Sequence, residues 1–88
     1  MTPTNRHAEA IYHVFTKYGF SLKDVINDSM FFKFQTRLSE IEAKHGIITT
    51  KKRITFTNKF GRKSSYMNYY KCVSNDKLIE LFKLYNDE

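Results

Sequence analysis

Basic side chains are concentrated in the second half of the sequence, where no acidic residue offsets them. The 88-residue chain carries a formal net charge of +6, and no Asp or Glu stands between Glu42 and Asp76. That stretch contains eight Lys and Arg residues, namely Lys44, Lys51, Lys52, Arg53, Lys59, Arg62, Lys63 and Lys71. A surface that is charged only for solubility mixes both signs. The segment therefore indicates an anionic partner, and nucleic acid is the foremost class.

Residue sets that carry out catalysis or bind metal ions are missing from the sequence. His7 and His13 are six residues apart, so they do not share the four-residue spacing of zinc ligands on a helix. Cys72 is the only cysteine, which excludes an intramolecular disulfide and a CxxC zinc site; we expect it to be a small buried residue of a strand. We therefore expect no enzymatic activity, no cofactor or metal, and no small-molecule substrate.

Membrane insertion is not expected either. The longest uninterrupted apolar run is Met30-Phe31-Phe32, far shorter than a membrane span. The first seven residues contain no apolar signal region. A single cysteine fits a reducing compartment, and we expect a cytoplasmic protein.

The basic region needs a folded scaffold to position it, and the N-terminal segment of the chain is the first part of that scaffold. Its apolar residues recur at the three- and four-residue spacing of an amphipathic helix. We expect this helix to begin at Thr2, an N-cap residue before Pro3, and to end at Gly19. Its apolar stripe consists of Ala8, Ile11, Phe15 and Tyr18.

A short second helix is expected after Ser21. Asp24 follows three residues later and gives a weak form of the capping box. The turn-forming residues 27–29 mark the end of this helix, and Asp28 or Ser29 is expected to cap the helix that follows.

The third helix, expected over residues 30–45 and ended by Gly46, has two distinct faces. The inward stripe consists of Phe31, Phe34, Leu38, Ile41 and His45. The opposite side carries Lys33, Thr36, Arg37, Glu40 and Lys44. We expect Glu40 to pair with Arg37 or Lys44 along the helix.

The apolar period then changes from 3.6 to 2 residues, which predicts a β-hairpin. One strand includes residues 52–57, a turn follows over 58–63, and the second strand covers 65–73. The register is left open, so either Tyr66 or Met67 faces inward. Ser74 caps a final helix over 75–86, which packs on the first helix or pairs with its copy in a homodimer.

These elements predict one α+β domain, mostly α, over residues 1–88, with its core in 4–73 and a C-terminal helix at 75–86. A hairpin alone is marginal in water and needs a helical layer on its apolar face. Three helices followed by such a hairpin are the order of a winged helix-turn-helix, in which the hairpin is the wing.

Residues 21 to about 70 resemble a winged helix-turn-helix family that is common in bacteriophage and prophage genomes. The resemblance rests on Ser21-Leu22, on Thr36-Arg37-Leu38-Ser39-Glu40-Ile41 with His45-Gly46-Ile47, and on Phe56-Thr57-Asn58-Lys59-Phe60-Gly61-Arg62-Lys63. The family has small residues where this chain has Met30 to Phe32, and the helix after Val73 lies outside the resemblance. The resemblance implies double-stranded DNA binding and transcription regulation in a phage or mobile element, in a bacterial or phage-infected cell.

The residues that would contact DNA follow from that arrangement. The N-terminal part of the recognition helix meets base edges in the major groove, which places Lys33, Thr36 and Arg37 nearest the bases and Gln35 at the margin. Arg37 would then read guanine and Gln35 adenine. The wing residues Lys59, Arg62 and Lys63 suit phosphates or the minor groove. Phosphate contacts are also expected from Lys44, Lys51, Lys52 and Arg53.

Each of these side chains also fits a solvated surface without a partner. Phe60 at the tip of the wing is either folded back on the hairpin or an exposed wedge, and the resemblance favours the first. Two other functions stay open. One is a protein-interaction module that binds a host protein through the same scaffold, and the other is RNA binding.

Overall fold

The computed structural model describes residues 2–86 and shows an α+β fold that is about half helical. The helices are α1 (Arg6–Thr16), α2 (Leu22–Ser29), α3 (Phe34–His45) and α4 (Asn75–Asn86), and the strands are β1 (Phe20–Ser21), β2 (Thr49–Thr57) and β3 (Lys63–Lys71). The predicted α+β class is therefore confirmed. No helix among the described residues is long and apolar enough to cross a membrane.

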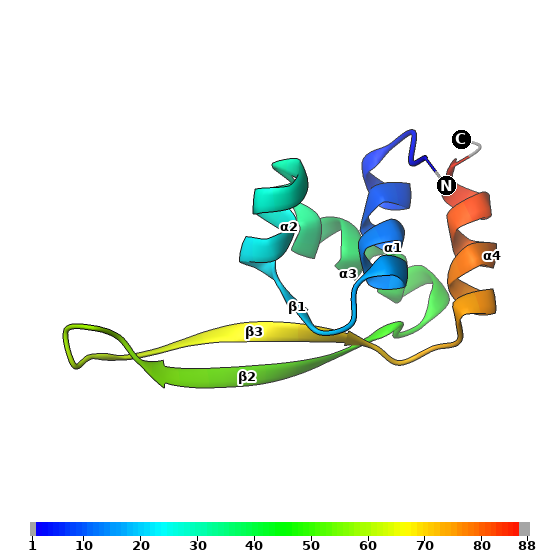
Figure 1. Ribbon diagram of the computed structural model, residues 1–88. Helices are drawn as coiled ribbons and strands as arrows, with labels where there is room; N and C mark the ends of the chain where they lie inside the picture. The colour runs from blue at the N-terminus through cyan, green and yellow to red at the C-terminus, as the bar shows by residue number, and fades with distance from the viewer. Residues whose placement is uncertain (1, 87–88) are drawn as a thin grey trace.

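The three strands form one antiparallel sheet in the order β1-β3-β2. Sequence reasoning missed β1, because two residues are too few to show a period of 2. The hairpin of β2 and β3 is longer than expected and projects beyond the helices as an arm (Figure 1). Its register places Arg53 opposite Met67 and Lys51 opposite Tyr69. The inward-facing residue is therefore Met67, since Tyr66 is exposed.

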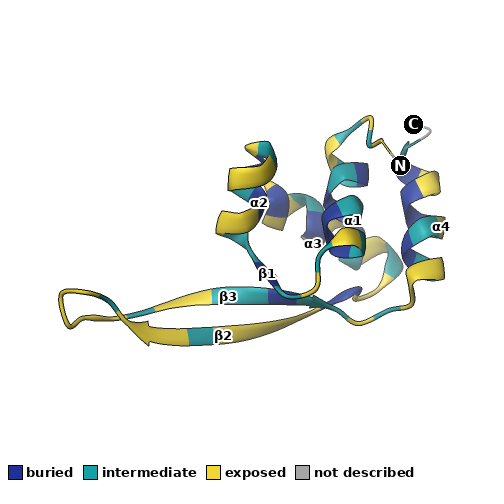
Figure 2. Cartoon of the chain, in the orientation of Figure 1, coloured by how far each residue is buried: buried dark blue, intermediate teal, exposed yellow. Residues whose placement is uncertain are grey.

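The helices pack over the inner end of this sheet. Phe20 of β1, Phe34 of α3 and Tyr69 of β3 meet with ring centroids 5.6 to 5.7 Å apart. Burial is concentrated between the helices and at the inner end of β3, whereas most of the outer arm is exposed (Figure 2). The arm therefore contributes little to the core, and its surface is available to a partner.

The last helix packs against the first, which was one of the two arrangements expected for it. α1 touches α4 along its length, and Leu78, Leu81 and Phe82 are buried. The two ends of the described chain are joined, because the Asn5 side chain donates a hydrogen bond to the Tyr85 carbonyl at 2.7 Å. A homodimer through this helix remains a prediction.

The first helix begins and ends at residues other than those expected. Asn5, not Thr2, is the N-cap, and its Oδ1 accepts a hydrogen bond from the Ala8 amide at 2.8 Å. The helix ends at Thr16, so Tyr18 lies beyond it and is 82% exposed instead of joining the apolar stripe. Gly19 has a φ of +73° but lies in the connection to β1.

The turn between α2 and α3 also differs from expectation. The capping box of Ser21 and Asp24 is confirmed, but α2 continues through residues 27–29 and is followed by Met30 at a φ of 55°. Neither Asp28 nor Ser29 caps α3, since Asp28 pairs with Lys17 and Ser29 donates to the Val25 carbonyl. α3 therefore begins at Phe34 instead of residue 30, with Lys33 as an N-cap that makes no side-chain bond. Gly46 ends it as predicted.

Candidate nucleic-acid interface

The outward face of α3 is small and polar. Phe34, Leu38 and Ile41 turn toward the core, as predicted. The opposite surface is a shallow hollow lined by Gln35, Thr36, Ser39, Glu40 and Ala43. No cation lines this hollow, and the short side chains of Thr36, Ser39 and Ala43 let the backbone of the helix come close to a partner.

Two cations of α3 and the N-cap residue Lys33 lie beside that face. Lys33, Arg37 and Lys44 are spaced by four and seven residues and share one row along the helix, given 3.6 residues per turn. Arg37 Nη1 lies 2.7 Å from Glu40 Oε1, so the expected pair within the helix is confirmed. The hydrogen bond from Arg37 lowers the pKa of Glu40, and His7 of α1 lies 3.6 Å from the same carboxylate. Arg37 is thus engaged on the α1 side of the helix.

Gln35 lies on the other flank and joins the helix to the hairpin. Its Nε2 donates a hydrogen bond to the hydroxyl of Tyr69 in β3 at 2.7 Å. A hollow of about 290 Å³ follows the angle between the two elements. Its walls are Gln35, Leu38 and Ser39 of α3 and Lys51, Met67 and Tyr69 of the hairpin. Helix and hairpin therefore form the two walls of one concave surface.

The three consecutive basic residues expected to bind phosphate, Lys51, Lys52 and Arg53, are divided between the two faces of the hairpin. Lys51 and Arg53 pair with Tyr69 and Met67, so they lie on the face that turns toward α3. Lys52 pairs with Asn68 and points to the opposite face, since successive side chains alternate across a sheet. The structure thus brings Lys51 and Arg53 together with α3 and leaves Lys52 outside the concave surface. Arg53 Nη1 also lies 3.3 Å from Ser65 Oγ across the strands.

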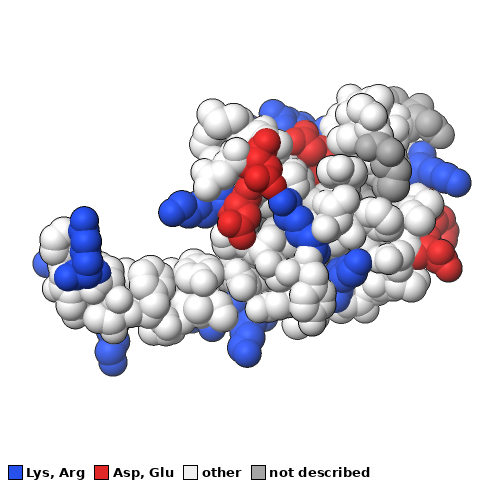
Figure 3. Space-filling view, viewed as in Figure 1, with Lys and Arg blue, Asp and Glu red and all other residues white. Residues whose placement is uncertain are grey.

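The tip of the arm carries the remaining cations. Lys59, Arg62 and Lys63 are all exposed. Basic side chains gather at the far end of the arm, and no acidic side chain is visible on the arm in Figure 3. Phe60 between them is 78% exposed. The expectation that this ring folds back on the hairpin is therefore wrong, because Phe60 lies in the turn beyond the last residues of both strands.

Glu42 connects the C-terminal part of α3 to the start of the hairpin, and sequence reasoning missed it. Its Oε2 accepts hydrogen bonds from the Ile48 amide at 3.0 Å, and from the Thr49 amide and hydroxyl at 3.1 Å each. The Glu42 side chain is only 11% exposed. Its oxygen Oε1 also lies 3.9 Å from Lys51 Nζ. An acidic residue near the C-terminal end of a helix is disfavoured by the helix dipole, and that position was the one available signal of a special role.

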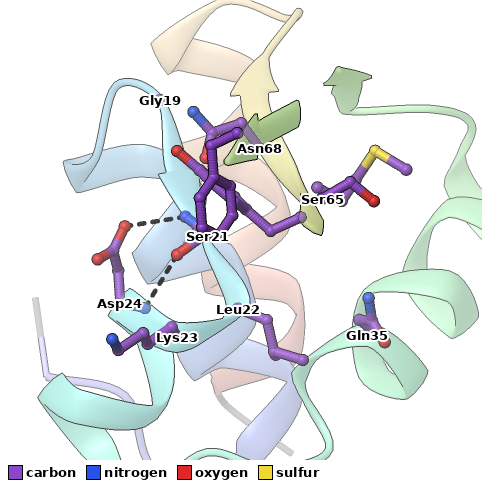
Figure 4. Close-up of a pocket in the computed structure, with 11 residues that line it drawn as sticks. Gly19, Ser21, Leu22, Lys23, Asp24, Gln35, Ser65 and Asn68 are labelled. Carbon is purple, nitrogen blue, oxygen red and sulfur yellow. Dashed lines mark hydrogen bonds between the residues drawn. The ribbon is translucent and has the colours of Figure 1, made fainter. Parts of the chain in front are cut away.

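A cleft of about 670 Å³ lies between the start of α2 and β3, and it adjoins the concave surface because Gln35 and Met67 line both (Figure 4). Ser21 and Asp24 line it, but their polar atoms are engaged in the capping box. Among residues 2–86 no group of three or more His, Cys, Asp or Glu side chains is placed to hold a metal ion. Cys72 is exposed, contrary to expectation, because it follows the end of β3.

Comparison with known proteins identified no relative of this chain. No protein-family model, curated protein or solved structure shows a significant match to the chain.

Proposed function

We propose that this chain is a winged helix-turn-helix protein that binds double-stranded DNA, with α2 and α3 as the helix-turn-helix and the β2-β3 hairpin as the wing. The order of elements supports this assignment. So does the pairing of β1, which lies between the first two helices, with β3. In this arrangement α3 enters the major groove, whose width of about 12 Å admits one helix.

The observation that carries the proposal is the concave surface formed by α3 and the hairpin. One wall presents the small polar residues of α3, and the other presents Lys51 and Arg53. The arm then extends the cations to its tip, with no acidic residue between Glu42 and Asp76. A convex duplex with phosphates along both edges of its groove is complementary to that shape and charge.

The contacts follow from the two walls. Thr36 and Gln35 face base edges near the start of α3, where recognition helices meet the bases. Lys33 and Lys44 border the groove, where they meet phosphates. Arg37 can read guanine, as the sequence suggested, once its bond to Glu40 is exchanged for the base. Lys51, Arg53, Lys59, Arg62 and Lys63 bind the backbone along the arm, and Lys52 does not contribute. The proposed role is transcription regulation in a phage or mobile element.

The test is fluorescence anisotropy with a labelled mixed-sequence duplex at about 50 and 200 mM salt. The five arm cations alone should make the association constant fall roughly 500-fold between these concentrations, and the phosphate contacts at the border of the groove should steepen the fall further. Replacing Lys63 by Ala should lower the slope of log affinity against log salt by about 0.9. Lys83→Ala on α4 is the matched control and should leave the slope unchanged. Absence of binding at the lower salt concentration would refute the proposal.

One observation favours the alternative of a protein-interaction module. Met30 and Phe32, at the turn between α2 and α3, are each 63% exposed. Exposed apolar side chains in one place are typical of a surface that binds another protein. Two results together would support this second function. The wild type would not bind DNA at about 50 mM salt, and Phe32→Ala would lose binding to a protein partner.

A further inference from the structure

The most exposed ring of the arm lies at its end. Phe60 is 78% exposed and stands between cations in the sequence, with Lys59 Nζ 5.1 Å from the centre of its ring. An apolar ring held in water gains nothing from the hydrophobic effect. Contact with an apolar surface of a partner would therefore be favourable, and the flanking cations require that partner to be anionic.

The backbone of the tip is ordered in a way that presents this ring. Asn58 Oδ1 accepts hydrogen bonds from the Phe60 amide at 2.9 Å and from the Arg62 amide at 3.0 Å. The Asn58 amide donates to the Arg62 carbonyl at 2.8 Å, and the Gly61 amide donates to the Asn58 carbonyl at 3.0 Å. Gly61 adopts a φ of +80°, which favours glycine. The turn is thus formed before any partner arrives.

The length of the arm matches the geometry of B-DNA. The last pair that β1 makes with β3 is Ser21 with Asn68, and five further β2-β3 pairs run from Arg53-Met67 to Thr57-Lys63. Five residues of strand extend about 17 Å. This is the reach of the paired strands beyond β1, and the turn with Phe60 lies further out. It is comparable to half of the roughly 34 Å helical turn, the spacing between a major groove and the neighbouring minor groove. With α3 in the major groove, the tip reaches the next minor groove.

We propose that Phe60 is a wedge that inserts between base pairs from the minor groove and bends the DNA, an inference that rests on the proposed DNA binding. Apolar side chains inserted at a base step unstack it partially and kink the duplex toward the major groove. Lys59, Arg62 and Lys63 then hold the phosphates on either side. Flexible pyrimidine-purine steps such as TA should be the preferred insertion sites.

The experiment measures bending and unstacking on a duplex of about 30 base pairs with a central TA step, the length over which protein-induced bends are resolved. End-to-end energy transfer reports the bend, and 2-aminopurine in place of the central adenine reports unstacking. The wild type should raise both signals. Phe60→Ala should bind within about tenfold of the wild-type affinity yet lose most of both signals, whereas Phe60→Leu should retain them, since leucine also serves as a wedge.

Phe56→Ala is the matched control, because Phe56 is another exposed ring of the same arm. Its ring packs on that of Tyr66, with the two ring centroids 5.8 Å apart. It should keep the bend. Thermal unfolding of Phe60→Ala should match the wild type, given the exposure of the ring. Binding with equal bending by wild type and Phe60→Ala would refute the wedge and leave DNA binding intact, whereas no binding at all would refute both. Sedimentation with anionic phosphatidylglycerol vesicles that depends on Phe60, without any effect of Phe60 on bending, would assign the ring to a membrane and overturn the proposal.

Discussion

Removing the carboxylate of Glu42 should destabilise the protein more than any other change of a charged residue considered above. In Glu42→Ala, three donors lose their acceptor, namely the amides of Ile48 and Thr49 and the Thr49 hydroxyl. Ile48 and Thr49 are buried. Each unsatisfied buried group costs about 1–3 kcal/mol.

Partial relaxation and entry of water reduce the sum, so we expect a loss of about 3–5 kcal/mol in the free energy of unfolding. For a domain of this size each kcal/mol lowers Tm by about 4–8 °C, which gives a total of at least roughly 12 °C. Glu42→Gln keeps a carbonyl oxygen as acceptor and loses only the contribution of the charge, so it should cost about 1 kcal/mol.

The assay is urea denaturation followed by circular dichroism, with thermal unfolding in parallel. Glu80→Ala is the control, because Glu80 is an exposed glutamate on α4. It should change the free energy of unfolding by less than about 0.5 kcal/mol. A Glu42→Ala variant that unfolds like Glu80→Ala would show that the carboxylate does not connect α3 to β2.

Two further predictions concern the arm and the core. Arg53→Ala should weaken DNA binding and lower the slope of log affinity against log salt by about 0.9. Lys52→Ala should change neither quantity, because the two side chains lie on opposite faces of β2. Equal effects of the two variants in the same anisotropy titration would contradict the assignment of Arg53 alone to the face that binds DNA. Burial is the main cause that lowers the pKa of His13 below its ordinary value of 6.5, and the positive charge of Lys17 is the second cause. The unfolded chain therefore binds a proton more readily, and the free energy of unfolding should decrease as the pH falls from 6.5 toward the lower pKa of the folded state. Urea denaturation at pH 7.5 and 5.5 should show this loss in the wild type and a smaller one in His13→Gln, and an unchanged loss in that variant would assign the effect to other groups.

The sequence by itself determined the kind and order of the main elements. The apolar periods of α1, α3 and α4 are visible because one face of each helix must be buried, and the glycine after α3 ends that helix as its conformation allows. The distribution of charge was equally readable, since an acid-free stretch needs no structure to be seen. The sequence did not predict which of several neighbouring polar residues caps each helix. Asn5 replaced Thr2 as the cap of α1, and Asp28 and Ser29 bonded to neighbours instead of capping α3.

Only the tertiary structure decided which basic residues lie on one surface. Alternation along any strand separates Lys52 from Lys51 and Arg53, but the sequence leaves open which of the two sets faces α3, and the pairing of Lys51 with Tyr69 and of Arg53 with Met67 decides it. The exposure of Phe60 depends on how far the arm projects beyond the helices, which no local pattern encodes. The role of Glu42 arises from groups six and seven residues away that meet its carboxylate only after the chain turns at Gly46. Side-chain type and spacing are local properties, whereas the face a residue presents is determined by pairing between segments far apart in the chain.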